Sequence, residues 1–344
     1  MTSLAAATLI QWLALTSLVV LIGAAGLDLF VLPSTATTFD DARASLRRWI
    51  VFAIAMLFMA TLGHLLIRTR TMSGGGLGAA MAAMPVVLTR THFGAIWIAR
   101  LAGLAAIAGC LAMPARLARP LTFALAIGLG LTTSLTGHAS DWGDFSVSVL
   151  VDYVHLLAAA IWVGGLVSLA AAVFPRVSGA PAPPVVSMAR RFSTLAGTAL
   201  AIVVLSGSYN AWVQTRIVSA LWTTTYGRVL LGKLCLVVVV AGFGAVNRFA
   251  VLPGLAGTRS SGLGGTLLSR VASVGPHAVP GALRARLAGF VAVEALLGLL
   301  ILACTAVLTE SAPARHVIRM RHSQTMDDMA DEAQKAAPHG HEAR

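Results

Sequence analysis

Long apolar runs alternate with short polar segments along the whole chain of 344 residues. Each run holds about twenty residues with few charges, which is the length that an α-helix needs to cross roughly 30 Å of hydrocarbon. The pattern therefore predicts an all-α integral membrane protein, a bundle of about eight transmembrane helices. We place these helices at residues 8–31, 49–67, 94–113, 118–137, 149–173, 192–214, 228–248 and 286–309.

The segments between these helices differ in composition. Pro114 and Pro120 mark the short link between the third and fourth helices and predict a tight turn. Residues 69–91 and 253–285 are long and rich in glycine and serine, so we expect two flexible loops. The stretch GAPAPP at 179–184 predicts a stiff, extended connector.

Composition supports a membrane protein over a soluble one. Of all residues 57% are hydrophobic and 11% are charged, against roughly 45–50% and 25% in soluble domains. The net charge of +12 is spread over many short loops without a continuous basic stripe, which disfavours nucleic-acid binding. The chain shows no nucleotide-binding motif, so we expect no enzyme, and we expect any transport to be passive or coupled to an ion gradient. The three cysteines have no pair spacing, and we expect no disulfide framework.

Lysine and arginine are distributed unevenly between the two sides of the predicted bundle. Most of them lie in the loops after the first, third, fifth and seventh helices. The loop after the fourth helix has none and carries Asp141 and Asp144 instead. Because cytoplasmic loops are enriched in lysine and arginine, we expect the odd-numbered loops in the cytoplasm and both termini outside, in the periplasm.

With this orientation, most histidines fall at the outer ends of the helices. His64 lies near the end of the second helix, His92 precedes the third and His138 ends the fourth. His155 lies about 9 Å below the outer surface at 1.5 Å per residue. Neutral imidazole is the commonest metal ligand, and an ionisable residue inside a spanning helix indicates function by default. We therefore predict that these four histidines are metal ligands. For any one of them alone, a hydrogen bond to a neighbouring helix is the competing interpretation.

Acidic and aromatic residues accompany the predicted ligands. Asp152 and Trp162 share a helical face with His155, and a carboxylate one turn away can orient an imidazole ring. We expect Asp141 and Asp144 to flank the same site.

Methionines point to copper more than to other metals. Met56 and Met59 lie one turn apart below His64, and thioether sulfur suits Cu(I). Packing against lipid or core is the competing explanation for both. In the tail, His316 and His322 are possible auxiliary ligands.

Other polar groups inside the predicted helices have less specific meanings. Asp28 and Glu294 lie nearer the cytoplasmic side, and Lys233 lies nearer the outside. Glu294 is expected either to pair with an arginine at the inner boundary or to serve as an exit-side carboxylate. Gly164 and Gly165 are expected to allow close packing of helices.

From the fourth helix onward, the chain resembles the CopD family of bacterial copper-resistance membrane proteins. The matching stretches are GHA at 137–139, VDYVHLLAAAIWVGGL at 151–166, RRFSTLAGTALAIVVLSGSYNAW at 190–212, YGRVLLGKL at 226–234, GAVNRF at 244–249 and EALLGLLILACTAVLTESAP at 294–313. The resemblance divides the chain into an N-terminal four-helix membrane half at 1–136, a CopD-like membrane domain at 137–313, and a polar tail with histidine and methionine at 314–344.

The resemblance implies a multi-pass protein of the bacterial inner membrane that handles copper, as Cu(I) or Cu(II), in copper homeostasis or resistance. It implies copper import and a periplasmic copper-binding partner of the CopC type, which we expect to be a separate protein. It carries over His138 and His155 as copper ligands, whereas His64 and His92 come from the topology alone. Two alternatives stay open: a haem-binding redox protein with axial histidines, and a copper-delivery or assembly factor without net transport.

Overall fold

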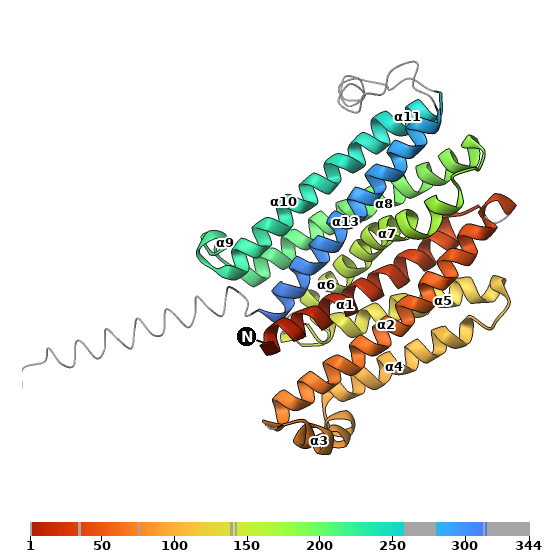
Figure 1. Ribbon diagram of the computed structural model, residues 1–344. Helices are drawn as coiled ribbons and strands as arrows, with labels where there is room; N and C mark the ends of the chain where they lie inside the picture. Colours follow the sequence, from red (N-terminus) through yellow and green to blue (C-terminus); the bar gives the residue numbers. More distant parts are fainter. Residues whose placement is uncertain are drawn as a thin grey trace, which may run out of the picture.

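A computed structural model describes residues 2–33, 36–74, 76–137, 140–141, 143–257, 280–311 and 314. The described part is a helical bundle without strands, and eight of its helices are long and apolar enough to cross a membrane (Figure 1). These eight spans are Leu4–Val31, Thr37–Ser73, His92–Cys110, Ala115–Ser134, Val147–Arg176, Ala182–Thr215, Thr225–Leu255 and Gly281–Glu310. Each overlaps one of the eight predicted helices, so the predicted fold class is confirmed.

Within these spans, α-helices are joined by short turns of other helical types. The α-helices are α1 (Thr2–Gly26), α2 (Asp40–Ser73), α3 (Leu77–Arg90), α4 (His92–Cys110), α5 (Ala115–Ser134), α6 (Val147–Ala159), α7 (Gly165–Ser168), α8 (Ala182–Thr215), α9 (Ala220–Thr223), α10 (Thr225–Val246), α11 (Leu252–Leu255) and α13 (Pro280–Glu310). The π-helical turns are η1 (Leu27–Val31), η4 (Ala160–Gly164), η5 (Leu169–Val173) and η7 (Asn247–Val251), and the 3-10 turns are η2 (Thr37–Phe39) and η6 (Phe174–Arg176).

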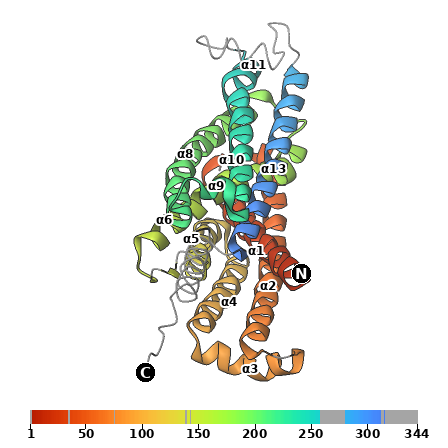
Figure 2. The ribbon, with the colours of Figure 1, turned by 90° about the vertical axis from the view of Figure 1, so that its left-hand side faces the viewer.

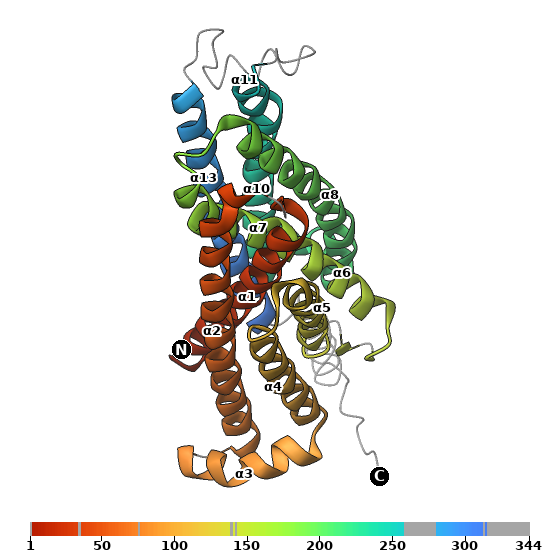
Figure 3. The ribbon, with the colours of Figure 1, turned by 90° about the vertical axis from the view of Figure 1, so that its right-hand side faces the viewer.

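The prediction of a flexible loop at residues 69–91 is wrong. Helix α2 continues to Ser73, Gly74 turns the chain with a φ of 63°, and α3 follows. The segment after the glycines is rich in alanine and methionine, which favour helix. Val87 of α3 packs with Leu65 and Trp97 in a small buried cluster, and Figure 3 shows α3 lying across the ends of α2 and α4.

The other connections agree only in part with expectation. Pro114 precedes α5 as predicted, but Pro120 lies inside that helix; spanning helices tolerate proline because their neighbours help to satisfy the backbone. In the connector at 179–184, Gly179 and Ala180 lie in a turn, Pro181 alone is extended, and α8 begins at Ala182. Of the loop expected at 253–285, the first residues form α11, residues 258–279 lie outside the described residues, and α13 begins at its far end.

The core is built around α1, which contacts α2, α5, η4 and α13. Gly164 of η4 crosses α1 so closely that a β-carbon there would lie 1.9 Å from the carbonyl oxygen of Val19. Gly165 leaves room for the ring of Phe192 in the same way. The indole of Trp12 donates to the carbonyl of Leu299 at 3.1 Å, which ties α1 to α13. The predicted role of Gly164 and Gly165 in close packing is therefore confirmed. All three cysteines are free thiols.

The two ends of the bundle carry different elements. The start of α1, the end of α13, and the short helices α3 and α9 lie at one end, here called the α3 end (Figure 1). The loop from α1 to α2, the loop from α4 to α5, and α11 lie at the other, the α11 end. Figure 2 shows α10 and α13, which contact each other, running side by side between these ends. The predicted orientation, with the α3 end outside, stays a prediction.

Candidate functional site

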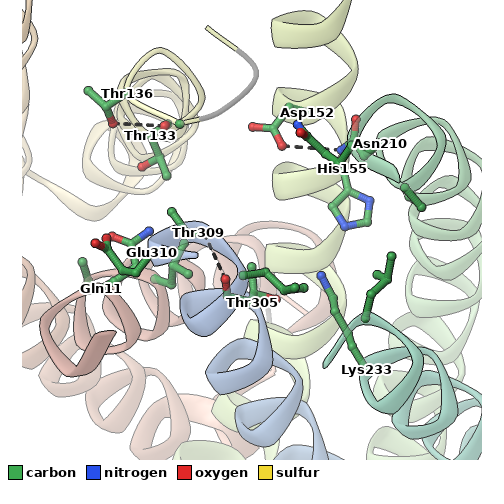
Figure 4. Close-up of a pocket in the computed structure, with 18 of the residues that line it drawn as sticks. Gln11, Thr133, Thr136, Asp152, His155, Asn210, Lys233, Thr305, Thr309 and Glu310 are labelled. Carbon is green, nitrogen blue, oxygen red and sulfur yellow. Dashed lines mark hydrogen bonds between the residues drawn. The ribbon is translucent and has the colours of Figure 1, made fainter. Parts of the chain in front are cut away.

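A cavity of about 350 Å³ lies within the bundle near the α3 end. Residues of α1, α2, α4, α5, α6, α8, α10 and α13 line it, so both halves of the chain contribute. Figure 4 shows that it is polar on several sides. Its polar lining includes Gln11, His64, Arg68, Arg100, Thr133, Thr136, Asp152, His155, Asn210, Tyr226, Lys233, Thr305, Thr309 and Glu310.

His155 enters the cavity from α6, whose first turn is capped by Ser146 accepting from the amide of Val149 at 3.3 Å. The Nδ1 atom of His155 lies 3.0 Å from the hydroxyl of Ser206. That hydroxyl donates its one proton to the carbonyl of Ile202 at 2.5 Å. Ser206 can therefore accept from Nδ1, and the tautomer in which it does so has its lone pair on Nε2. In Figure 4 the ring points into the same space as the side chain of Lys233.

The residues predicted to support His155 lie in different surroundings. Asp152 lines the cavity and accepts from the amide of Asn210 at 3.5 Å. Trp162 is buried in the main core and does not line the cavity. Trp162 lies inside the π-helical turn η4, which is wider than an α-helical turn. Residues in and after such a turn therefore point in other directions than a continuous α-helix would give them.

His64 reaches the cavity from α2, one turn before Arg68. Its Nε2 atom is buried and, among the described residues, has no hydrogen-bond partner. A buried polar atom without a hydrogen-bond partner calls for an explanation, and a role in binding a ligand is one. Met56 and Met59 do not line this cavity, and Met59 is 60% exposed on the outside of the bundle.

The remaining predicted ligands are not in this cavity or are not described. The Nε2 atom of His92 lies 3.4 Å from a carboxylate oxygen of Asp144, with both side chains partly exposed at the α3 end. Asp141 is exposed in the same loop. His138, His316 and His322 lie outside the described residues, although Gly137 lines the cavity. In the described ranges, no three His, Cys, Asp or Glu side chains gather as a metal site would require.

Sequence reasoning missed Arg100, which is 6% exposed and lines the cavity. Its Nε donates to the hydroxyl of Thr132 and one terminal nitrogen donates to the carbonyl of the same residue, both at 2.9 Å. The sequence does contain a signal for this residue, because Arg100 interrupts an otherwise apolar run and charged residues within spanning helices are rare.

The two acidic residues that were expected nearer the cytoplasmic side have local partners. Asp28 lies 3.1 Å from Arg119 and 3.9 Å from Arg43. Glu294 accepts from the amide of Asn247 at 2.5 Å, so its partner is an asparagine and not the arginine named as one alternative.

Comparison with known protein families finds one matching family model for each half of the chain. A family model described as Copper resistance protein D matches residues 186–308. A second, described as Copper resistance protein D-like, N-terminal domain, matches residues 1–147. The chain belongs to the copper resistance protein D family. It is a multi-pass bacterial membrane protein of this copper resistance and transport family.

Two curated relatives are 33% identical to this chain. One is the Copper transport protein CutJ of Bacillus subtilis, aligned over 214 residues, which are 58% of this chain and 39% of that protein. The other is the Copper resistance protein D of Pseudomonas syringae pv. tomato, aligned over 180 residues, which are 49% of this chain and 57% of that protein. The chain thus spans about half the length of the curated relatives it matches. Both are named for copper and neither for haem. No solved structure matches.

Proposed function

We propose that this protein takes a copper ion into the cavity, binds it between His64 and His155, and moves it across the membrane. One observation carries the proposal: two imidazoles from different helices line one cavity inside the spanning bundle. The buried Nε2 of His64 has no described partner, and the contact with Ser206 favours the tautomer of His155 whose lone pair is on Nε2. Imidazole nitrogen is a suitable ligand for copper.

The position of the cavity supports entry of copper from the periplasmic side. It lies near the α3 end, which the distribution of lysine and arginine assigns to the periplasm. Copper then enters from the periplasm and moves inward, and a CopC-type copper-binding protein is the proposed donor. The exposed pair of His92 and Asp144 lies at this end, where a donor would approach. Delivery to another protein without net transport is the alternative, and copper binding without flux would support it.

The test is copper binding by purified protein and copper flux into proteoliposomes. We expect His64→Ala and His155→Ala each to weaken copper binding by more than about ten-fold, since each removes one of two ligands. His92→Ala is the matched control, because His92 does not line the cavity, and we expect it to bind copper like the wild type. Unchanged binding in a correctly inserted His64→Ala, His155→Ala double variant would show that the proposed site is wrong.

A further inference from the structure

One carboxyl group that does not line the copper cavity is buried within the spanning bundle. Glu294 of α13 is 4% exposed and lies about 20 Å along the helix from Gly281, where the span begins. Among the described residues, no Lys, Arg or His side chain forms an ion pair with it. Its hydrogen-bond partner is the uncharged amide of Asn247, at 2.5 Å. An ionised carboxylate without a counter-charge is costly in hydrocarbon, so such a group is expected to bind a proton or another cation.

The neighbouring elements bring no charged group to this carboxyl group in the described part of the chain. Helix α13 packs mainly against α1, η4, α7, η5, α10, η7 and α11. Of these, α1, η4, α7, η5 and α11 contain no charged residue. On η7, the guanidinium of Arg248 donates to the hydroxyl of Ser193 on α8 at 3.1 Å. The other titratable or charged residues lie more than three turns from Asn247 on α10 or more than two turns from Glu294 on α13: Tyr226, Arg228, Lys233, Cys235, Arg284, Arg286, Cys304 and Glu310.

The partner of Glu294 has an unsatisfied atom of its own. The Oδ1 atom of Asn247 is buried and, among the described residues, has no hydrogen-bond partner. An ionised carboxylate cannot satisfy this atom, because its oxygens only accept, whereas a protonated carboxyl group has one O–H donor. An acid group and an amide group are complementary, since the acid accepts from the amide nitrogen and donates to the amide oxygen. A proton on Glu294 therefore removes both the uncompensated charge and the unsatisfied acceptor.

This pair joins the same two helices that line the copper cavity. Helices α10 and α13 run side by side (Figure 2), and Val237 of α10 and Thr305 of α13 line the cavity. Asn247 and Glu294 lie about 15 Å farther along these helices, toward the α11 end. Asn247 also begins the π-helical turn η7, and such turns are frequent at functional sites. A movement of α10 against α13 would therefore change the cavity and the surroundings of the carboxyl group together.

We propose that Glu294 and Asn247 form a proton-binding site within the membrane, and that this site couples copper movement to the proton gradient. The carboxyl group of Glu294 holds one proton, which it donates to Oδ1 of Asn247. It releases this proton as the carboxylate forms, so one proton is carried in each cycle. Carboxyl groups within spanning helices serve as proton carriers in pumps and transporters. The coupling rests on the proposed function, whereas the proton site itself does not.

The first test records infrared spectra of copper-free protein at neutral pH. We expect the carbonyl stretch of a protonated carboxyl group in the wild type and its loss in Glu294→Gln, which keeps the size of the side chain but has no acid proton. In Asn247→Leu the band should remain and shift to higher frequency, because the carboxyl group has lost its hydrogen bonds to the amide. Asp40→Asn is the control, since Asp40 is exposed and paired with Arg43, and it should leave the band unchanged. Equal spectra of the wild type and Glu294→Gln would overturn the proton site.

The second test measures copper accumulation in proteoliposomes with an imposed pH gradient, while potassium and valinomycin hold the membrane potential at zero. If one proton moves with each copper ion, a gradient of about one pH unit should change the accumulation ratio of wild-type protein by up to about ten-fold. We expect no response in Glu294→Gln and a normal response in Asp40→Asn.

The two tests separate the proton site from the proposed function. The infrared band together with copper accumulation that ignores the pH gradient would overturn the coupling and leave the proton site and the proposed function standing. The infrared band in a protein that moves no copper would overturn the proposed function, and the coupling with it, and leave the proton site standing.

Discussion

Gly164→Ala is expected to destabilise the folded bundle by about 3 kcal/mol or more. A methyl group at this position would lie 1.9 Å from the carbonyl oxygen of Val19 and 3.2 Å from the Cα of Gly23. Both neighbours are backbone atoms of α1, so no side chain can rotate away. The whole of α1 must move, and α1 is the most buried of the spanning helices in the described part of the chain. Unfolding of the purified protein in mixed micelles, titrated with a denaturing detergent, measures the change.

Gly128→Ala is the matched control for this substitution. Gly128 lies on the spanning helix α5, and a β-carbon there would meet nothing within 4 Å. Because alanine favours helix over glycine by up to about 1 kcal/mol, the control should be unchanged or slightly more stable. Equal stability of the Gly164 and Gly128 variants would contradict the close contact between α1 and η4.

Asn247→Leu is expected to lower the free energy of unfolding by about 2–3 kcal/mol. Asn247 and Glu294 are 7% and 4% exposed, and the asparagine donates to the carboxyl group at 2.5 Å. Removing the donor leaves the carboxyl group of Glu294 buried without this hydrogen bond, and a buried unsatisfied group retains its full desolvation cost. The same detergent titration measures the loss.

The double variant Asn247→Leu, Glu294→Met separates this hydrogen bond from simple packing. Replacing both partners with apolar side chains of similar size leaves no polar group unsatisfied, so much of the lost stability should return. If the two single effects instead add in the double variant, the contact between Asn247 and Glu294 does not carry the stability. Asp40→Asn, which alters an exposed ion pair with Arg43, should change stability by less than about 1 kcal/mol.

The individual site residues were partly predictable. His64 and His155 stand out because polar residues are rare in apolar runs, and both line the cavity. The same criterion applied to Arg100 would have identified it. Trp162 and Met59 were assigned from ideal helical spacing, and each lies elsewhere. A π-helical turn changes the phase at Trp162, and the neighbouring helices decide which face of α2 is exposed at Met59.

By itself, the sequence determined the number of spanning helices and their approximate limits. The reason is local: in hydrocarbon, the backbone of a long apolar run must satisfy its hydrogen bonds within the run, so it forms a helix. Only the tertiary structure decided that His64 and His155 share a cavity, that Arg100 and Lys233 line it too, and that His92 contacts Asp144 instead. Those relations depend on close helix contacts, such as Gly164 against α1, and on π-helical turns that rotate one segment against the next. Such contacts join residues far apart in the chain, and no local pattern encodes them.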